Sequence, residues 1–265
     1  HRPETAEEAI KLLSDKPNSR LVAGGTDMIV NVRRGIEQPE DLIALDAIAD
    51  LKNIKEGVNG LQIGAGVTLN QVANHPLIIE NYTAISEAAS SVAGGTHQQY
   101  GTIGGNLCLD TRCLFYNQSE WWRQSNDYCM KERGDICHVA PGGKRCFAAF
   151  SGDIAPAMLV YQAEVELLGP NGLRRIPLTD LYQNDGMNHL TLTPGELVKV
   201  IHIPKTLSGS PSRYEKVRIR GSIDFPSILA HGKEKGLKFF IVEQEAYTGT
   251  SQLESAKDNY NYMSA

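Results

Sequence analysis

Apolar residues along the first part of the chain recur at two spacings, which together predict alternating helices and strands. From residue 5 to residue 16 they recur every three or four positions, which is typical of an amphipathic helix. Thr5 and Glu8 match a capping box, in which each side chain accepts a hydrogen bond from an unpaired amide at the helix start. The apolar run at 20–23 predicts a buried strand, and the pattern at 28–35 predicts a second helix. The expected order is helix, strand, glycine turn, helix.

The same style of pattern continues to residue 101. Alternating apolar and polar residues at 61–65 predict a strand. Thr68 and Gln71 match another capping box, and the segment 85–92 is typical of a helix rich in small residues. We therefore expect a second unit of strands and helices after the first.

Two glycine turns stand between these elements. Gly24 and Gly25 follow the first strand, and Gly104 and Gly105 follow the predicted helix at 85–92. Glycines let a backbone approach a phosphate closely, and the amides at the start of a helix can bind an anion. One such turn is equally compatible with an ordinary tight turn. Two of them in one domain favour a dinucleotide ligand.

Length and charge limit the classes of protein to consider. A chain of 265 residues with 41% hydrophobic residues is long for one ordinary domain, so two domains are expected. The net charge of −5 argues against a nucleic-acid partner, and small molecules and protein partners are expected instead. No apolar run approaches the roughly 20 residues that cross a bilayer. With no secretory signal, the prediction is a cytoplasmic protein with no membrane contact. Because the chain begins at His1, we expect a few residues to precede it.

All five cysteines lie between positions 108 and 146, which is the most distinctive feature of the chain. In a reducing cytosol such clustering favours metal ligation over disulfides. Cys113, Cys129, Cys137 and Cys146 share one long segment without a paired Cys-x2-4-Cys knuckle, which zinc sites usually have. Well-separated thiolates can surround a larger cluster. The spacing favours iron–sulfur, with structural zinc or no metal as open alternatives.

Three motifs carry a resemblance to a known family. Residues 23–27 (Ala-Gly-Gly-Thr-Asp), 102–106 (Thr-Ile-Gly-Gly-Asn) and 152–156 (Gly-Asp-Ile-Ala-Pro) resemble the FAD-binding motifs of one group of flavoproteins. These are the flavoprotein subunits of the xanthine oxidase and carbon monoxide dehydrogenase family of molybdenum hydroxylases. Four segments that carry or adjoin cysteines, at 108–113, 115–123, 135–139 and 145–146, are similar to the β subunits of 4-hydroxybenzoyl-CoA reductases. In those subunits an insertion in the flavin domain binds a [4Fe-4S] cluster.

The resemblance implies an α+β fold. It consists of a two-subdomain FAD-binding domain of the PCMH type with an iron–sulfur loop insertion, followed by a truncated α/β C-terminal domain. The expected ranges are 1–56 for the first subdomain, 57–180 for the second with the cysteine-rich insertion at 108–150, and 181–265 for the C-terminal domain. From about residue 232 the tail departs from the family pattern. It is similar to the last strand and helix of sugar-phosphate isomerase barrels, although one strand and one helix cannot form a barrel.

The resemblance also implies which residues hold the cofactors. The FAD pyrophosphate is expected against Arg20, Leu21, Val22, Ala23, Gly24, Gly25, Thr26 and Asp27. Its other side is expected against Thr102, Gly104, Gly105 and Asn106. Asp153 would bind the ribose of the adenosine half, Asp110 would lie close to the cofactor, and Lys216 would lie near the isoalloxazine. The four cluster ligands would be Cys113, Cys129, Cys137 and Cys146.

Several of these residues have simpler explanations that stay open. Asp153 can be a helix N-cap, since Asp is common there, and Lys216 can be a solvated charge on a strand. Cys108 is expected to be a small buried thiol, because four thiolates already complete a cluster. Trp121 and Trp122 are expected to cover the insertion with apolar surface.

The resemblance implies an electron-transfer subunit rather than a substrate-binding one, so no catalytic residue is expected in this chain. Electrons would pass from ferredoxin through [4Fe-4S] and FAD towards the [2Fe-2S] clusters of a small subunit and the molybdenum of a large subunit. The assembly would be a heterotrimer, dimerised, that removes the phenolic hydroxyl of 4-hydroxybenzoyl-CoA to give benzoyl-CoA. Two alternatives stay open: a flavin domain with a structural zinc loop, and a cofactor-free remnant that binds partners.

Overall fold

The computed structural model describes residues 1–216 of the chain. The helices are α1 (Ala6–Asp15), α2 (Met28–Arg33), α3 (Leu69–Asn74), α4 (Pro76–Asn81), α5 (Thr83–Ser91), α6 (Gly95–Tyr100), α7 (Ile103–Leu107), α8 (Glu120–Ser125) and α9 (Ile154–Val160). The strands are β1 (Ser19–Val22), β2 (Asp41–Ala44), β3 (Ile54–Gly57), β4 (Gly60–Gly64), β5 (Glu164–Gly169), β6 (Gly172–Pro177) and β7 (Leu197–Pro204). Short 3₁₀ helices span Ala49–Lys52, Leu178–Leu181 and Lys205–Leu207. The predictions for the tail from about residue 232 lie outside the described residues.

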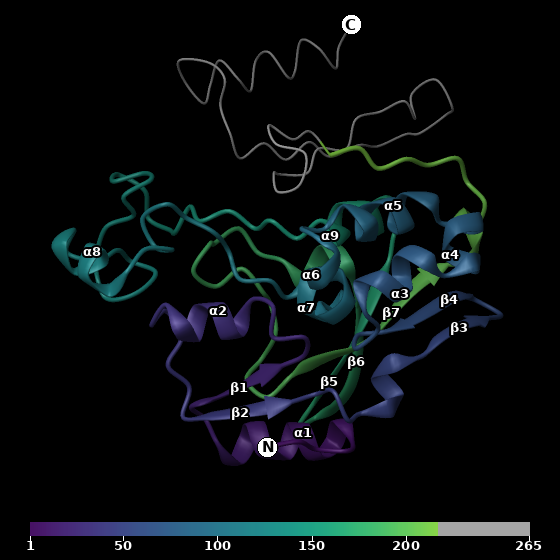
Figure 1. Cartoon of the computed structure of the whole chain (residues 1–265), viewed down its shortest axis with the longest axis horizontal. Coiled ribbons are helices and arrows are strands. Elements are labelled where there is room, and N and C mark those ends of the chain that lie inside the picture. Colours follow the sequence, from purple (N-terminus) through teal and green to yellow (C-terminus); the bar gives the residue numbers. More distant parts are fainter. Residues whose placement is uncertain (217–265) are drawn as a thin grey trace, which may run out of the picture.

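The first unit is built as the sequence pattern predicts. Strands β1 and β2 pair in parallel, α1 packs beside them, and α2 follows the first glycine turn (Figure 1). The cap of α1 differs in one detail, because the Glu8 carboxylate accepts from the Glu4 amide at 2.9 Å instead of from Thr5. Only the Thr5 half of the predicted box is present, with Thr5 Oγ1 accepting from the Glu8 amide at 3.2 Å. At Thr68 and Gln71 both halves of the predicted box form.

The second unit is a five-stranded sheet in the order β3-β4-β7-β5-β6, with each neighbouring pair antiparallel. The last of its strands in sequence, β7, therefore lies at the centre and joins β4 to β5. This sheet extends to residue 204, beyond the expected domain boundary at 180, and β3 spans the expected boundary at 56. The domain limits remain predictions, but the sheet ties the segments on either side of both limits together.

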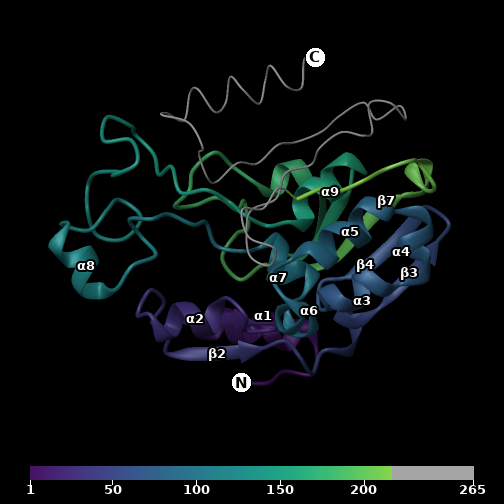
Figure 2. The same ribbon diagram turned by 45° about the horizontal axis from the view of Figure 1, so that its top comes forward.

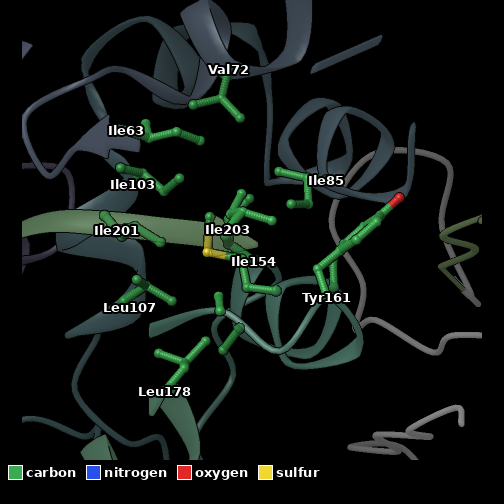
Figure 3. Close-up of a cluster of buried hydrophobic side chains, with 14 of the residues drawn as sticks. Ile63, Val72, Ile85, Ile103, Leu107, Ile154, Tyr161, Leu178, Ile201 and Ile203 are labelled. Atoms are coloured by element: carbon green, nitrogen blue, oxygen red, sulfur yellow. The ribbon is translucent and has the colours of Figure 1, made fainter. Parts of the chain in front are cut away.

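The main core lies between this sheet and the helices that cover it. Figure 3 shows Ile63 of β4 and Ile201 of β7 directed toward side chains of α7 and α9, among them Ile103 and Ile154. All four side chains are fully buried. A smaller cluster fills the space between α1 and the other elements near it, where Ala9 packs with residues of β2, β5 and β7. Burial of apolar surface on this scale is the main stabilising term of a domain.

The cysteine-bearing insertion between α7 and α9 projects to one side of the sheets, at the left of Figures 1 and 2. It contains the short helix α8, and an isolated β-bridge pairs Arg112 with Ala149. The remaining chain forms turns and irregular loops. The bridge brings the two ends of the insertion together beside the main body.

Candidate functional site

A cavity of about 1670 Å³ runs from the two glycine turns to the base of the cysteine insertion. Pockets for drug-sized ligands occupy roughly 300–1,000 Å³, so this one is large enough for a dinucleotide. The predicted cofactor residues that line it are Leu21, Ala23, Gly24, Gly25, Thr26, Asp27, Thr102, Gly104, Gly105, Asn106, Asp110, Asp153 and Lys216. Residues far apart in the sequence, such as Gly24 and Lys216, thus line one space.

The first glycine turn is shaped by close backbone packing. A Cβ at Gly24 would lie 1.8 Å from the carbonyl oxygen of Tyr100, which no side chain tolerates. Gly25 has φ +71°, a left-handed conformation that glycine adopts without strain. The two glycines therefore bring the turn against the end of α6 and leave one wall of the cavity as bare backbone.

The second turn is held by two side-chain caps. Thr102 Oγ1 accepts a hydrogen bond from the Gly105 amide at 3.1 Å and so starts α7. The buried Asn106 side chain accepts from the Ile154 amide at 3.0 Å and so starts α9. A Cβ at Gly104 would lie 2.6 Å from the Cβ of Ala65, which fixes α7 against the end of β4. The turn is preformed by the protein's own contacts.

Two predicted residues lie away from the cavity lining. Arg20 is exposed on β1 and pairs with Glu37, with 3.0 Å between Nε and Oε2. Val22 ends the same strand without lining the cavity. In this structure the two residues shape the strand that precedes the glycine turn.

Asp153 and Lys216 form a buried ion pair, with the Lys216 Nζ 3.0 Å from Oδ1 and 3.1 Å from Oδ2. Tyr214 donates its hydroxyl to Asp153 Oδ1 at 2.9 Å. Although Asp153 precedes α9, its side chain does not cap that helix. The resemblance assigns Asp153 to the adenosine ribose and Lys216 to the isoalloxazine. A flavin that used both residues in those roles would have to separate the pair.

Electrostatic interactions connect Cys113 with Cys129 and with Cys146, and Cys137 with Cys146. Burial raises the pKa of the Cys129 thiol, and Cys113 raises it further. Burial also raises the pKa of Cys146, the Ala148 amide lowers it, and Cys137 and Cys113 raise it again. Cys129, Cys137 and Cys146 are buried, whereas Cys113 is half-buried. We call these four residues the cysteine quartet.

Backbone amides also reach the sulfurs of the quartet. The Ala148 amide lies 3.4 Å from Cys146 Sγ, and the amides of Lys131 and Glu132 lower the pKa of Cys129. Hydrogen bonds of this kind stabilise a thiolate over a thiol. They are also among the features that set the potential of an iron–sulfur cluster.

Cys108 stands apart from the quartet. It lines the flavin-sized cavity, and burial raises its pKa to about 12, so its thiol stays protonated at neutral pH. Its accessible surface makes Cys108 half-buried, so the expectation of a small buried thiol is met only in part. The expectation that both tryptophans cover the insertion does not hold for Trp121, which is 74% exposed, while Trp122 packs on Phe115 with ring centroids 6.1 Å apart.

Two ion pairs join the insertion to the flavin-sized cavity, and the sequence pattern did not reveal them. Arg112 pairs with Asp27 of the first glycine turn. Asp110, which lines the cavity, pairs with Lys131, with 2.8 Å between Oδ1 and Nζ. The sequence offered one sign of these pairs: Arg112 and Lys131 each lie within two residues of a quartet cysteine. Their partners, as many as 85 residues away, are set by the fold.

Within residues 1–216, no three or more His, Cys, Asp or Glu side chains are arranged to hold a single metal ion. The predicted [4Fe-4S] cluster therefore stays a prediction. The helices of this part of the chain are also all too short or too polar to span a bilayer.

The geometry gives a cavity of dinucleotide size between two glycine turns, and comparison with known proteins gives its family. Residues 1–206 match the model of the FAD binding domain in molybdopterin dehydrogenase, and the chain belongs to this family. This confirms the predicted FAD-binding subunit of the xanthine oxidase and carbon monoxide dehydrogenase family, with FAD as its cofactor. The match identifies the family and does not distinguish 4-hydroxybenzoyl-CoA reductase from its other members.

Individual relatives agree with the family. The chain is 31% identical over 239 residues to the aldehyde oxidoreductase FAD-binding subunit PaoB of Escherichia coli (strain K12), covering 84% of this chain and 73% of that protein. It is 28% identical to the nicotinate dehydrogenase FAD-subunit of Eubacterium barkeri, covering 83% of this chain and 63% of that protein. Both relatives are oxidoreductase subunits.

A solved structure supports the fold. The crystal structure of the cyanide-inactivated Cu,Mo-CO dehydrogenase has a chain that superposes with a TM-score of 0.65 and 27% identity. The match covers 85% of this chain and 65% of that chain. The chain thus spans less than two thirds of several of its relatives, so what their complexes do is only a proposal for this protein.

Proposed function

We propose that this chain is the electron-transfer flavoprotein subunit of a molybdenum-containing reductase similar to 4-hydroxybenzoyl-CoA reductase. The subunit would carry FAD and a [4Fe-4S] cluster. The partners would be a molybdenum-containing large subunit, a [2Fe-2S] small subunit and a ferredoxin as electron donor. Reductive dehydroxylation of the aromatic acyl-CoA would take place on another subunit.

The cavity and its glycine turns support the FAD half of the proposal. Bare backbone at Gly24 and Gly25 gives the pyrophosphate a wall of amides without side-chain obstruction. Thr26 and Thr102 would contribute hydroxyls from either side of the same space. When bound, FAD can take up one or two electrons and so can link one-electron carriers to a two-electron reduction. The chain's part is to bind the coenzyme and keep it in a fixed position.

The cysteine quartet is the single observation that carries the cluster half. A [4Fe-4S] cluster takes four thiolates, and here one insertion carries four thiols, of which three are buried and each interacts electrostatically with at least one other. Backbone amides form hydrogen bonds with two of the sulfurs, and such bonds orient and tune the ligands of a cluster. The remaining thiol, Cys108, belongs to the other cavity.

Proximity of the two sites supports an electron-transfer role. Cys113 lines the same cavity as the glycine turns, so one quartet member borders the flavin space directly. Arg112 and Asp110, on the adjoining chain, tie the insertion to that space through ion pairs.

Paired cysteine variants test the proposal. Cys129→Ser removes a quartet member, and Cys108→Ser is the matched control, because it replaces a half-buried thiol outside the quartet. After anaerobic reconstitution with iron and sulfide, wild type and Cys108→Ser are expected to hold about four irons per chain and Cys129→Ser far fewer. All three should retain FAD.

The same proteins should differ in electron uptake. Mixed with reduced ferredoxin, wild type and Cys108→Ser should show bleaching of the flavin absorption, and Cys129→Ser should show it much more slowly. Zinc in place of iron in the wild type would contradict the proposal. Equal iron in both variants would contradict the assignment of the quartet.

A further inference from the structure

An ion pair between Arg112 and Asp27 joins the cysteine-bearing insertion to the first glycine turn. The guanidinium donates to Asp27 Oδ1, and the two side chains are 32% and 27% exposed. Both residues line the flavin-sized cavity, so the pair lies in its wall. Figures 1 and 2 show α2 and the insertion on the same side of the molecule. The pair therefore connects two parts of the chain that surround one space.

The Asp27 carboxylate is committed to this contact. Asp27 directly precedes α2, at a position where an aspartate commonly caps the helix with its side chain. Here the carboxylate makes no such cap. Its Oδ2 accepts a hydrogen bond from the Asn31 side-chain amide at 3.2 Å, while Oδ1 accepts from Arg112. One carboxylate thus ties the end of the glycine turn both to α2 and to the insertion.

The backbone of Arg112 is held at the base of the insertion. Its amide donates to the Ala149 carbonyl at 2.7 Å, and its carbonyl accepts from the Ala149 amide at 2.9 Å. The Arg112 Nη1 also donates to the Asp110 carbonyl at 3.1 Å. The guanidinium therefore reaches Asp27 from a point where the two ends of the insertion are already bonded to each other.

A second contact joins the insertion to the other end of α2. Arg123, which is 1% exposed, donates from Nη2 to the Gly35 carbonyl oxygen at 3.3 Å. Gly35 lies in the turn that follows α2. Between these two points, Val30 of α2 and Phe115 of the insertion both line the cavity. Movement of the whole insertion away from α2 requires both contacts to break.

We infer that the Arg112–Asp27 pair is a clamp, which holds the base of the insertion against the first glycine turn and slows the release of FAD. The FAD pyrophosphate is expected against this turn, where the charge of Asp27 alone would repel it. Arg112 compensates that charge and closes the wall of the cavity beside it. The inference goes beyond the proposed function, because it requires FAD in the cavity and no metal in the insertion.

The rate of FAD release from the FAD-loaded chain tests the clamp, followed by the rise in flavin fluorescence after dilution. Arg112→Met and Asp27→Ala each remove one partner, and a double variant removes both. Arg112→Lys keeps the positive charge. Arg133→Met is the matched control, because it removes an exposed arginine whose ion pairs with Glu120 and Glu132 lie within the insertion.

Arg112→Met and Asp27→Ala should each release FAD roughly tenfold faster than wild type, and the double variant no faster than either. Arg112→Lys should stay closer to wild type than Arg112→Met, and Arg133→Met should be unchanged. Unchanged release from Arg112→Met would overturn the inference. Slower release from Asp27→Ala would also overturn it, since Arg112 would then only neutralise a repulsive carboxylate. Effects that add up in the double variant would show that the two residues act separately, which contradicts a clamp.

Hydrogen exchange of the flavin-free protein gives a second measurement that needs no coenzyme. Arg112→Met should speed amide exchange in residues 27–35 and 109–113 and leave the strands of the five-stranded sheet unchanged, because the opening is local. Unchanged exchange in both segments would overturn the clamp, and faster exchange in the sheet as well would replace it with a general loss of stability.

The outcomes also separate the clamp from the proposed function. A protein that releases FAD as expected and takes up no iron would overturn the proposed cluster and leave the clamp standing. A wild type that binds iron but shows the same FAD release as Arg112→Met would overturn the clamp and leave the proposed function standing.

Discussion

The flavin-binding scaffold and the cysteine insertion are stabilised in opposite ways. In the scaffold, apolar side chains such as Ile63 and Ile201 are fully buried, and most ion pairs, such as Arg2 with Asp46, are exposed, whereas Asp153 with Lys216 is buried. In the insertion, Arg123 is 1% exposed and Lys131 5%, while Leu114 is 83% exposed. Charges and thiols are inside the insertion, and large apolar residues are at its surface. The scaffold can fold on hydrophobic burial, whereas the insertion depends on ion pairs and, under the proposed function, on a metal cluster.

The largest expected effect concerns the scaffold core. Ile201→Ala leaves a cavity at the centre of the five-stranded sheet and should lower the free energy of unfolding by about 3 kcal/mol. Leu114→Ala, on the surface of the insertion, should change it by less than about 0.5 kcal/mol. Urea unfolding followed by circular dichroism measures both. Similar losses in the two variants would contradict the contrast between the regions.

The next effect concerns the glycine turn of the scaffold. Gly24→Ala should weaken FAD binding roughly 30-fold, about 2 kcal/mol, because the added Cβ meets the Tyr100 carbonyl and displaces the turn. Gly95→Ala is the matched control, since a Cβ there meets no atom within 4 Å. Titration of flavin-free protein with FAD gives both affinities. An unaltered affinity in Gly24→Ala would remove the turn from the binding site.

A smaller effect is expected within the insertion. Arg123 donates to Glu132 at 2.9 Å, to the Gln118 carbonyl at 2.6 Å and to the Gly35 carbonyl at 3.3 Å. Arg123→Met should lower the free energy of local opening of the insertion by about 1.5 kcal/mol. Proteolysis within the insertion should then be roughly tenfold faster. Arg133→Met, which alters an exposed arginine, should leave the proteolysis rate unchanged.

The urea midpoint of the sheet should be the same in both arginine variants. If Arg123→Met lowered it as much as Ile201→Ala does, the insertion would be part of the scaffold's cooperative unit. The two regions would then have to be treated as one.

The smallest effect is a pH-dependent one at the rim of the scaffold. Arg174 holds the pKa of the Glu196 carboxyl at about 2, below its ordinary 4.5, by hydrogen bonds of 2.6 and 2.7 Å. Because the folded-state pKa is the lower one, this pair stabilises the protein above about pH 4.5 and the contribution is lost as the pH falls towards 2. Glu196→Gln should cost about 1 kcal/mol at pH 7, since Arg174 is partly screened by water.

That cost should shrink at pH 4 and be almost absent near pH 2, as measured by urea unfolding at each pH. Glu164→Gln is the control, because its pair with Arg175 is more exposed on both sides. A cost for Glu196→Gln that did not change with pH would contradict the assigned ion pair.

The sequence predicted local structure better than it predicted long-range pairing. The helix after Thr5, the strand before Gly24 and the capping box at Thr68 depend on neighbouring residues, and all three are present. The place of β7 between β4 and β5 depends on pairing across more than a hundred residues, and no local pattern encodes it. The hydrogen bond by which Asn106 caps α9 likewise joins residues 48 positions apart, so no local pattern predicts it.

In the candidate site, too, residue types were predicted from the sequence and long-range contacts were not. The glycine turns and the cysteines were identified from residue type and spacing, and the fold brings them to one cavity and one insertion. The pairing of Asp153 with Lys216 was not foreseen, because the two residues were assigned separately to different parts of the flavin. Arg112 and Lys131 were missed because a charged residue in a loop gives no sign of its partner.

The central claim is that one chain holds two redox cofactors, and that the scaffold keeps its own without the other. The most direct test is to reconstitute the wild-type protein, count FAD and iron in one sample, and then remove the iron with a chelator. The account predicts about one FAD and about four irons per chain, with FAD still bound and the insertion newly open to protease after chelation. Protein that binds FAD together with zinc but no iron, or that loses FAD along with the iron, would contradict it.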